Sequence, residues 1–296
     1  MNRYLDPKID LVFRRIFGEH EHLCISLLNS MLPLEPDRQI VSLEYNSNTL
    51  LPDSPLFKES AVDVNCTDNF GRKFLVEMQL YWTKSFQQRV LFNASKAYVR
   101  QLDRGRKFHL LRPVYALSFV NTIFDKDSSI FYHDYKIVNL ADTQKQIEGL
   151  ELVSIELPKF HPSNDAGKKM QDLWLKFLTE IDDTSDNVPS EILQEELTQE
   201  ALHYLEITSY SKEQLQAYDK YFDAISTVRT IHSDLFEEGM EKGIKKGIKK
   251  GVERGIKKGM ENKEIEIVRN CKLKGFSLEQ IQDITGLSKK RIKEIL

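Results

Sequence analysis

The sequence predicts an α/β fold, in which helices pack against a mixed sheet, followed by an all-helical C-terminal region. Two observations lead to this prediction. Patterns typical of a helix, a hairpin, a second helix and further strands follow one another in the first half of the chain. From about Asp165 the patterns are helical only. We therefore expect four segments, 1–164, 165–232, 233–262 and 263–296.

The spacing of apolar residues locates the individual elements. Spacings of three and four residues predict helices, and proline or glycine marks their ends. The helices are expected over 6–32, 84–105, 170–181, 191–204 and 212–231. Continuous or alternating apolar runs of strand length predict strands. The strands are expected over 41–45, 61–67, 74–80, 114–120, 131–140 and 150–157.

The composition is that of a soluble globular protein, because 41% of the 296 residues are hydrophobic and 29% are charged. A net charge of −3 argues against a uniformly basic nucleic-acid binder, so any basic surface is local. Three cysteines without close spacing fit a reducing compartment, which predicts a cytoplasmic protein. The polar N-terminus and the lack of an apolar run near 18 residues predict neither secretion nor a membrane span.

The stretch 58–81 reads as a hairpin, with two apolar-rich runs around an Asp-Asn-Phe-Gly turn at 68–71. If the hairpin is symmetric about this turn, Asp63 and Glu77 are cross-strand partners with Cβ atoms about 4.5–5.5 Å apart. Gln79 lies two residues beyond Glu77 and therefore shares its face.

Two carboxylates at this separation repel each other unless one is protonated or a cation lies between them. Mg²⁺ is held by one or two carboxylates together with waters and substrate phosphates. The hairpin therefore suggests Asp63 and Glu77 as ligands of Mg²⁺, or of another divalent cation such as Mn²⁺ or Ca²⁺. The alternative is an amphipathic hairpin whose polar face is solvated.

An Asp, a hairpin and an apolar strand ending in Glu-x-Gln, here DVN…FLVEMQ, resemble the PD-(D/E)xK nuclease fold with Gln in the Lys position. The whole is similar to the Rpn-type recombination-promoting nuclease and putative transposase family. Three further stretches carry the resemblance: DLVFRRIFG at 10–18, RVLFNASKAYVRQL at 89–102 and LRPVYALSF at 111–119. It covers roughly residues 1–160 and returns in the glycine repeats. It implies a PD-(D/E)xK nuclease-like sheet and a metal-dependent DNA endonuclease linked to recombination or transposition.

The resemblance also marks positions outside the hairpin. Asp10 matches the extra acidic residue that this fold supplies from its first helix, and Arg14 would meet a phosphate. For Asp10 alone, a first-turn acid favoured by the helix dipole is the alternative. Arg89, in the second expected helix, is another candidate for a phosphate contact, with a structural ion pair as its alternative. Lys58 is the lysine best placed to compensate for Gln79, unless it is simply solvated.

A glycine recurs at every fourth position of the segment 239–260, and the segment carries eight Lys or Arg against two Glu, a net charge of +6. As a helix it would be marginal, because each interior glycine costs about 1 kcal/mol relative to alanine. It is either a helix packed on a partner chain, which would make the protein a homo-oligomer, or a basic tether that follows phosphates, or a solvated linker.

The last segment resembles a helix-turn-helix. Ser277 is placed to cap a helix with Gln280 at the capping-box position, and Ser288 begins a second helix. Basic residues early in a recognition helix meet phosphates and base edges. These candidates for DNA contact are Lys289, Lys290 and Arg291. A helical hairpin for protein contact is the alternative, and for the whole chain the competing function is a non-catalytic DNA-binding or oligomeric assembly module with a degenerate nuclease site.

Overall fold

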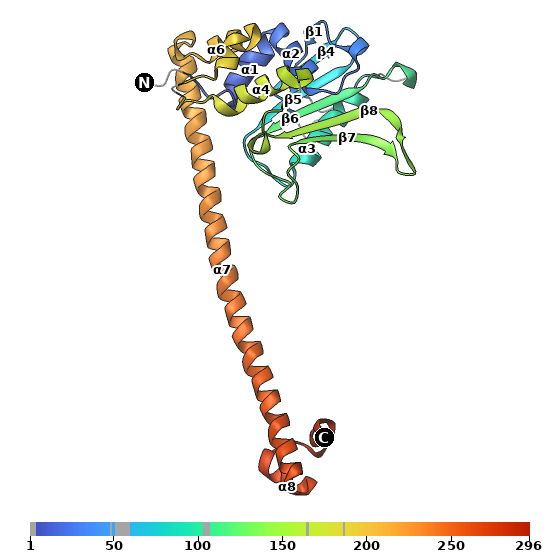
Figure 1. Cartoon of the computed structure of the whole chain (residues 1–296), viewed down its shortest axis with the longest axis vertical. Helices are drawn as coiled ribbons and strands as arrows, with labels where there is room; N and C mark the ends of the chain where they lie inside the picture. Colours follow the sequence, from blue (N-terminus) through green and yellow to red (C-terminus); the bar gives the residue numbers. More distant parts are fainter. Residues whose placement is uncertain (1–3, 48, 51–59, 103–106, 164–165, 186) are drawn as a thin grey trace. The chain divides into compact units, whose positions relative to one another are not determined.

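The structure is a computed structural model of the whole chain, and it describes residues 4–47, 49–50, 60–102, 107–163, 166–185 and 187–296 (Figure 1). Lys58, the lysine expected near the site, lies outside these residues. The chain divides into two compact units, Met1–Lys220 and Tyr221–Leu296.

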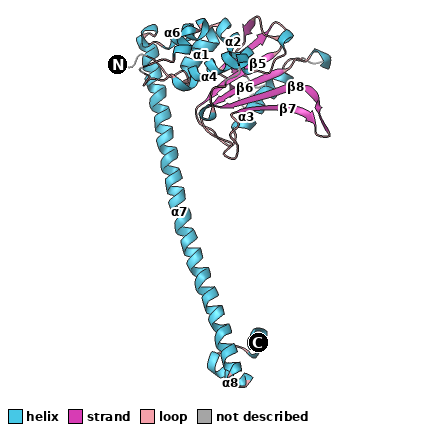
Figure 2. Cartoon of the chain, viewed as in Figure 1, coloured by secondary structure: helices cyan, strands magenta, loops and turns pink. Residues whose placement is uncertain are grey.

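The described residues of the first unit form a six-stranded mixed sheet with the strand order β1-β4-β5-β6-β8-β7 (Figure 2). Its strands are β1 (Leu43–Tyr45), β4 (Val64–Asp68), β5 (Lys73–Gln79), β6 (Val114–Val120), β7 (Tyr132–Asn139) and β8 (Asp142–Glu156). β6 runs parallel to β5 and to β8, and the other neighbours are antiparallel. A separate antiparallel pair consists of β2 (Thr49–Leu50) and β3 (Ser60–Ala61). The predicted mixed sheet is confirmed.

Helices lie on both faces of the sheet (Figure 1). On one face lie α1 (Asp10–Glu19), α2 (Glu21–Met31), α4 (Lys169–Glu180), α5 (Ser190–Gln194) and α6 (Glu196–Leu205). On the other face lies α3 (Phe86–Val99). Because both faces are covered, all residues of β6 are buried, which explains why this strand has no polar side in the sequence.

The two layers meet opposite faces of β6. The ring of Phe119 lies 6.0 Å from that of Phe13 on α1, measured between centroids. The neighbouring side chains Ala116 and Val120 belong to a second apolar cluster with Val90 of α3. The alternation of side chains along a strand therefore sends odd-numbered residues of β6 toward α1 and even-numbered residues toward α3.

Two of the predicted helices are each interrupted by one residue in an extended conformation. The helix expected over 6–32 becomes α1 and α2, because His20 has φ −121° and ψ 97°. Its Nδ1 lies 2.9 Å from the carbonyl oxygen of Arg15, at the end of α1. The helix expected over 191–204 is interrupted in the same way at Glu195. Apolar spacing continues across both breaks, so the sequence pattern did not reveal them.

Helix α4, which follows residue 164, shares the core of the first unit. The indole Nε1 of Trp174 on α4 donates to Ser26 Oγ of α2 at 3.0 Å, and its ring lies 5.3 Å from that of Phe17. The expected division of the chain into four segments stays a prediction.

A buried ion pair holds the turn between β4 and β5. Arg72 Nη2 lies 2.5 Å from Asp68 Oδ2 and donates to the carbonyl oxygen of Arg38 at 2.6 Å. Asp68 Oδ1 accepts the backbone N–H of Phe70 and of Arg72. Gly71 has φ 78°, a left-handed conformation that favours glycine. These contacts order the turn and with it the register of the hairpin.

The second unit contains most of α7 (Lys212–Leu273) and the short helices α8 (Leu278–Thr285) and α9 (Lys289–Ile295). Val268 of α7 packs with Ile281 and Ile292 in a small apolar core. Ser277 and Gln280 form the predicted capping box at the start of α8, which is confirmed.

The glycine repeat lies inside α7 and is helical. A Cβ atom added at any of its six glycines would meet no atom within 4 Å. The apolar side chains that follow these glycines are all exposed: Met240, Ile244, Ile248, Val252, Ile256 and Met260. Among the described residues, no helix is both long and apolar enough to cross a membrane.

Candidate active site

The hairpin of β4 and β5 has the predicted register. Its partners run from Val64↔Val76 to Thr67↔Lys73, which is symmetric about residue 70. The pairing ends at Val64, however, so the expected directly opposed pair of Asp63 and Glu77 does not form part of the ladder. The backbone N–H of Asp63 donates to the Val76 carbonyl oxygen at 3.1 Å.

The side chain of Asp63 replaces a backbone acceptor at the point where the ladder ends. Asp63 Oδ2 accepts the backbone N–H of Met78 at 2.6 Å. Asp63 is thus bonded to the residue before Glu77 and to the residue after it. The two acidic residues are neighbours across the strands, but their side chains have different partners.

The side chain of Asp63 lies against α1, the helix that carries Asp10 and Arg14. The Asp63 side chain is buried, and burial together with the hydrogen bond that the protonated Asp63 carboxyl donates to Asp10 raises the pKa of Asp63 from 3.8 to about 8. A hydrogen bond between two carboxyls requires a proton on one of them. At neutral pH and without a bound cation, the Asp10–Asp63 pair therefore holds a proton.

Arg14 contacts both acids of this pair. Its Nε lies 2.7 Å from Asp10 Oδ1, and its Nη2 lies 3.3 Å from Asp63 Oδ1. The two acids and the arginine thus form a partly buried cluster at the edge of the sheet. In this structure Arg14 is the counterion of the acids, and the phosphate contact expected for it stays a prediction.

Glu77 points to the other layer and meets α3. Asn93 Nδ2 donates to its Oε1 at 2.9 Å, and Arg89 Nη2 lies 3.3 Å from its Oε2. Burial raises the pKa of the Glu77 carboxyl, and the charge of Arg89 and the Asn93 hydrogen bond oppose this rise. Arg89 Nη2 also donates to Gln79 Oε1. The expectation that Glu77 and Gln79 share a face is confirmed by this common partner.

Two buried residues beside Glu77 were missed at the sequence level. Asn93 follows Arg89 by four residues, so both lie on one side of α3, and this spacing could have identified it. Ser118 is the partner of Glu77 in the neighbouring strand β6, and no sequence signal marks it. Within the described part of the chain, the buried Ser118 Oγ has no hydrogen-bond partner.

The oxygen atoms of this site suit a hard divalent cation. Asp10 and Asp63 present two carboxyls in contact, and the ion pair with Arg14 Nε at 2.7 Å compensates the charge on Asp10 Oδ1. Mg²⁺ needs only one or two carboxylates besides waters and phosphate. The described residues hold no group of three His, Cys, Asp or Glu side chains arranged for a metal ion, since Glu77 is turned to α3. The chemistry of the Asp10–Asp63 pair fits such a cation, and Glu77 is bound to Arg89 and Asn93 of α3 in this structure.

The basic residues expected to contact DNA in the last helix belong to the second unit. Lys289 Nζ lies 2.8 Å from Glu279 Oε1, and Arg291 Nη1 lies 3.5 Å from Glu294 Oε2. Lys290 is exposed. Ion pairs of exposed side chains are weak, so they do not prevent contact with a phosphate.

The proton on the Asp10–Asp63 pair predicts how stability depends on pH in the absence of divalent cations. The folded state binds a proton that the unfolded chain releases near pH 4, so the stabilisation is complete below pH 4 and is lost as the pH rises toward about 8. Thermal melting in EDTA between pH 5 and pH 9 should give a falling melting temperature. Asp63→Asn is neutral at every pH, so its melting temperature should fall less between pH 5 and pH 9 than that of the unchanged protein. The difference between the two falls should be at least about 2–4 °C.

The control for this experiment is Glu148→Gln, which removes an exposed acid far along the chain from the pair. It should melt with the same pH dependence as the unchanged protein. Parallel curves for Asp63→Asn and the unchanged protein would mean that Asp63 is ionised in the folded state.

Comparison with known proteins places these residues in a family. A family model described as PD-(D/E)XK nuclease family transposase matches residues 7–230, a span that includes α1, the hairpin and α3. No curated protein and no solved structure matches the chain. The match covers most of the chain and agrees with the mixed sheet, so the family predicted from the sequence is confirmed: this chain belongs to the PD-(D/E)XK nuclease family transposases.

Proposed function

We propose that this protein is a Mg²⁺-dependent DNA endonuclease that hydrolyses phosphodiester bonds in recombination or transposition in the cytoplasm. The observation that carries the proposal is the partly buried acidic pair Asp10–Asp63 at the point where the hairpin ladder ends, with Glu77 in the neighbouring strand. Buried acids with raised pKa values are common at catalytic sites. The membership in a nuclease family supports the same conclusion.

In this proposal Asp63 and Glu77 hold the cation, with Asp10 as a further ligand. When bound, Mg²⁺ lowers the pKa of a water molecule and neutralises charge on the scissile phosphate. Asp63 would serve as a ligand in its deprotonated form, and the Met78 N–H holds this carboxyl in place. Asn93 orients Glu77 in the same way from α3.

The two arginines act as exchangeable counterions. Arg14 and Arg89 occupy the acids in the free protein, and both side chains are partly exposed. With a cation bound to the acids, both guanidinium groups would be available to bind phosphate oxygens, which this group does well. The two guanidinium groups that pair with acids in the free protein would then contact the substrate.

Arg89 also contacts Gln79, the residue in the position where this fold often has a lysine. Many sites of this fold have a lysine where this chain has Gln79, and a neutral amide can orient the attacking water but carries no charge. Arg89 donates to both Gln79 and Glu77, so its positive charge lies beside the side chain that stands in the lysine position. We propose that Arg89 supplies this charge. Lys58, the other candidate, lies outside the described residues.

The C-terminal region supplies much of the DNA affinity in this proposal. The repeat 239–260 has a net charge of +6, and α9 adds Lys289, Lys290 and Arg291. Neutralising phosphates releases counterions, so such contacts strengthen binding at low salt. The acidic residues then perform the chemistry and the basic helices hold the DNA.

A second candidate function is a non-catalytic DNA-binding or oligomeric assembly module with a degenerate nuclease site. Gln79 in the lysine position favours it. So do the exposed apolar side chains at every fourth position of α7, which would be covered in a homo-oligomer.

The first test of the proposed function removes the ligands. Asp63→Ala and Glu77→Ala should each lower Mg²⁺-dependent plasmid nicking by about 10²-fold or more, because each removes charge stabilisation at the reacting phosphate. Glu148→Gln serves as the control and should nick normally. Melting curves show whether the variants are folded. Folded variants that nick at the normal rate would refute the site.

The second test concerns the charge at Gln79. Arg89→Ala should lower nicking about 10²-fold, and Gln79→Lys alone should keep or raise it. In the double variant Gln79→Lys with Arg89→Ala, the new lysine should restore most of the activity, because it returns a positive charge to the same face. A double variant as slow as Arg89→Ala would mean that Arg89 acts in another way.

The third test removes the basic C-terminal region by truncation after Ile231. DNA binding should weaken and its salt dependence should flatten, by about 0.9 in the slope of log K against log[salt] for each lost phosphate contact. Nicking at high enzyme concentration should persist, because the acidic site lies in the first unit. Binding titrations across a salt series measure both slopes. Equal slopes would show that the region does not bind DNA, and its role would then be self-association.

A further inference from the structure

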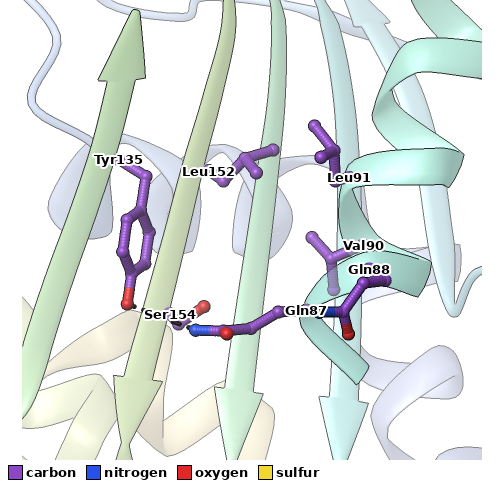
Figure 3. A pocket seen from close by; sticks show the side chains of 7 residues that line it. All are labelled: Gln87, Gln88, Val90, Leu91, Tyr135, Leu152 and Ser154. Atoms are coloured by element: carbon purple, nitrogen blue, oxygen red, sulfur yellow. Dashed lines mark hydrogen bonds between the residues drawn. The ribbon is translucent and has the colours of Figure 1, made fainter. Parts of the chain in front are cut away.

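A cavity of about 230 Å³ lies between α3 and the outer strands β8 and β7. Figure 3 shows its lining residues, with Gln87 reaching from α3 across the sheet toward Tyr135 and Ser154. The remaining lining residues are Gln88, Val90, Leu91 and Leu152. None of these lining residues belongs to the acidic site described above.

The lining defines the chemistry of a ligand. Among the described residues that line it, none has a charged side chain, so the ligand is neutral where it is enclosed. The aliphatic side chains and the Tyr135 ring suit a flat apolar body. Gln87 and Gln88 each offer an amide that both donates and accepts, and Ser154 adds a hydroxyl. Gln87 Nε2 and the Tyr135 hydroxyl are 3.4 Å apart, a long contact that a ligand can replace.

The size excludes large ligands. Pockets for drug-sized molecules enclose about 300–1,000 Å³, so a cavity of 230 Å³ suits a single ring system and not a whole nucleotide. A nucleobase meets these requirements, because it is flat and neutral and has an edge of alternating donors and acceptors.

The cavity is close to the acidic site. Gln88 is next to Arg89 in α3, and Arg89 contacts Glu77. Across the sheet, Glu77 of β5 is paired with Ser118 of β6, and Ser118 is paired with Ser154 of β8. Paired residues share a face, and two strand spacings of about 4.8 Å separate Glu77 from Ser154 by roughly 10 Å. The base and the phosphate of neighbouring nucleotides can span this separation.

We propose that this cavity binds one unstacked nucleobase of the DNA whose scissile phosphate lies at Glu77 and Arg89. This inference rests on the proposed function, and it narrows the substrate to DNA with an unpaired or extrahelical nucleotide beside the cleaved bond. The base packs on Tyr135 and the aliphatic wall, and Gln87 and Ser154 bind its edge. Extruding a base costs least where it is already unpaired, so such DNA binds best.

The test compares two fluorescein-labelled duplexes that differ by one unpaired adenine, with the full chain in EDTA. The unchanged protein should bind the duplex with the unpaired base about tenfold more tightly, as expected for one stacked base. Leu91→Trp fills the cavity and should abolish this preference. Val99→Trp is the matched control, since it places the same side chain at another exposed position of α3 outside the cavity.

A second variant, Gln87→Leu, keeps the volume but removes the polar edge, and it should lower the preference several-fold. It also keeps the test decisive if Leu91→Trp does not fold. Equal binding of the two duplexes by the unchanged protein, or an unchanged preference in folded Leu91→Trp or Gln87→Leu, would overturn the inference.

Plasmid nicking with Mg²⁺, measured in parallel, separates this inference from the proposed function. A protein that prefers the unpaired base but does not nick DNA has the base pocket without the nuclease activity. A protein that nicks DNA but has no such preference has the nuclease activity without the base pocket.

Discussion

The hydrogen bond from the Met78 backbone to Asp63 determines how the site is built. It forms where the β4–β5 ladder ends, and the carboxylate takes the place of a backbone carbonyl that the departing strand no longer offers. Because a buried N–H needs an acceptor, Asp63 is fixed in the layer of the sheet itself. From there its side chain reaches Asp10 of α1 on one face of the sheet, while Glu77 in the next strand is bound by α3 on the other face.

This arrangement places a buried acid against each of two helices, and each helix supplies its own arginine. Arg14 comes from α1 and Arg89 from α3. Removing one partner of a buried ion pair is costly, because it leaves an unpaired charge in a region of low dielectric. The free protein therefore keeps its acids paired or protonated. Arg14 compensates the Asp63 side chain from one layer and Arg89 compensates Glu77 from the other.

The sequence allowed prediction of the features that depend on local chemistry. The register of the hairpin follows from the turn at 68–71 and from the two-residue period of its strands, and β6 follows from its unbroken apolar run. The features in which the structure differs from these predictions depend on contacts between residues that are distant in the sequence. Asp63 leaves the register because Met78 needs an acceptor, and Ser118 joins the site only through the parallel pairing of β5 and β6. The break at His20 depends on a side-chain contact with a backbone carbonyl, which apolar spacing does not record.

The glycine repeat makes this part of α7 unstable as a helix, and the contacts within the second unit do not offset the cost. Six interior glycines cost about 6 kcal/mol relative to alanine. The ion pairs Lys242–Glu238 and Lys245–Glu241 return only about 0.5 kcal/mol each. The apolar side chains at every fourth position are exposed and contribute no burial. Repulsion among eight cations adds to the cost. A partner that lowers this repulsion or covers the apolar side chains would stabilise the helix. Phosphates would lower the repulsion, whereas a second copy of the chain would cover the apolar side chains.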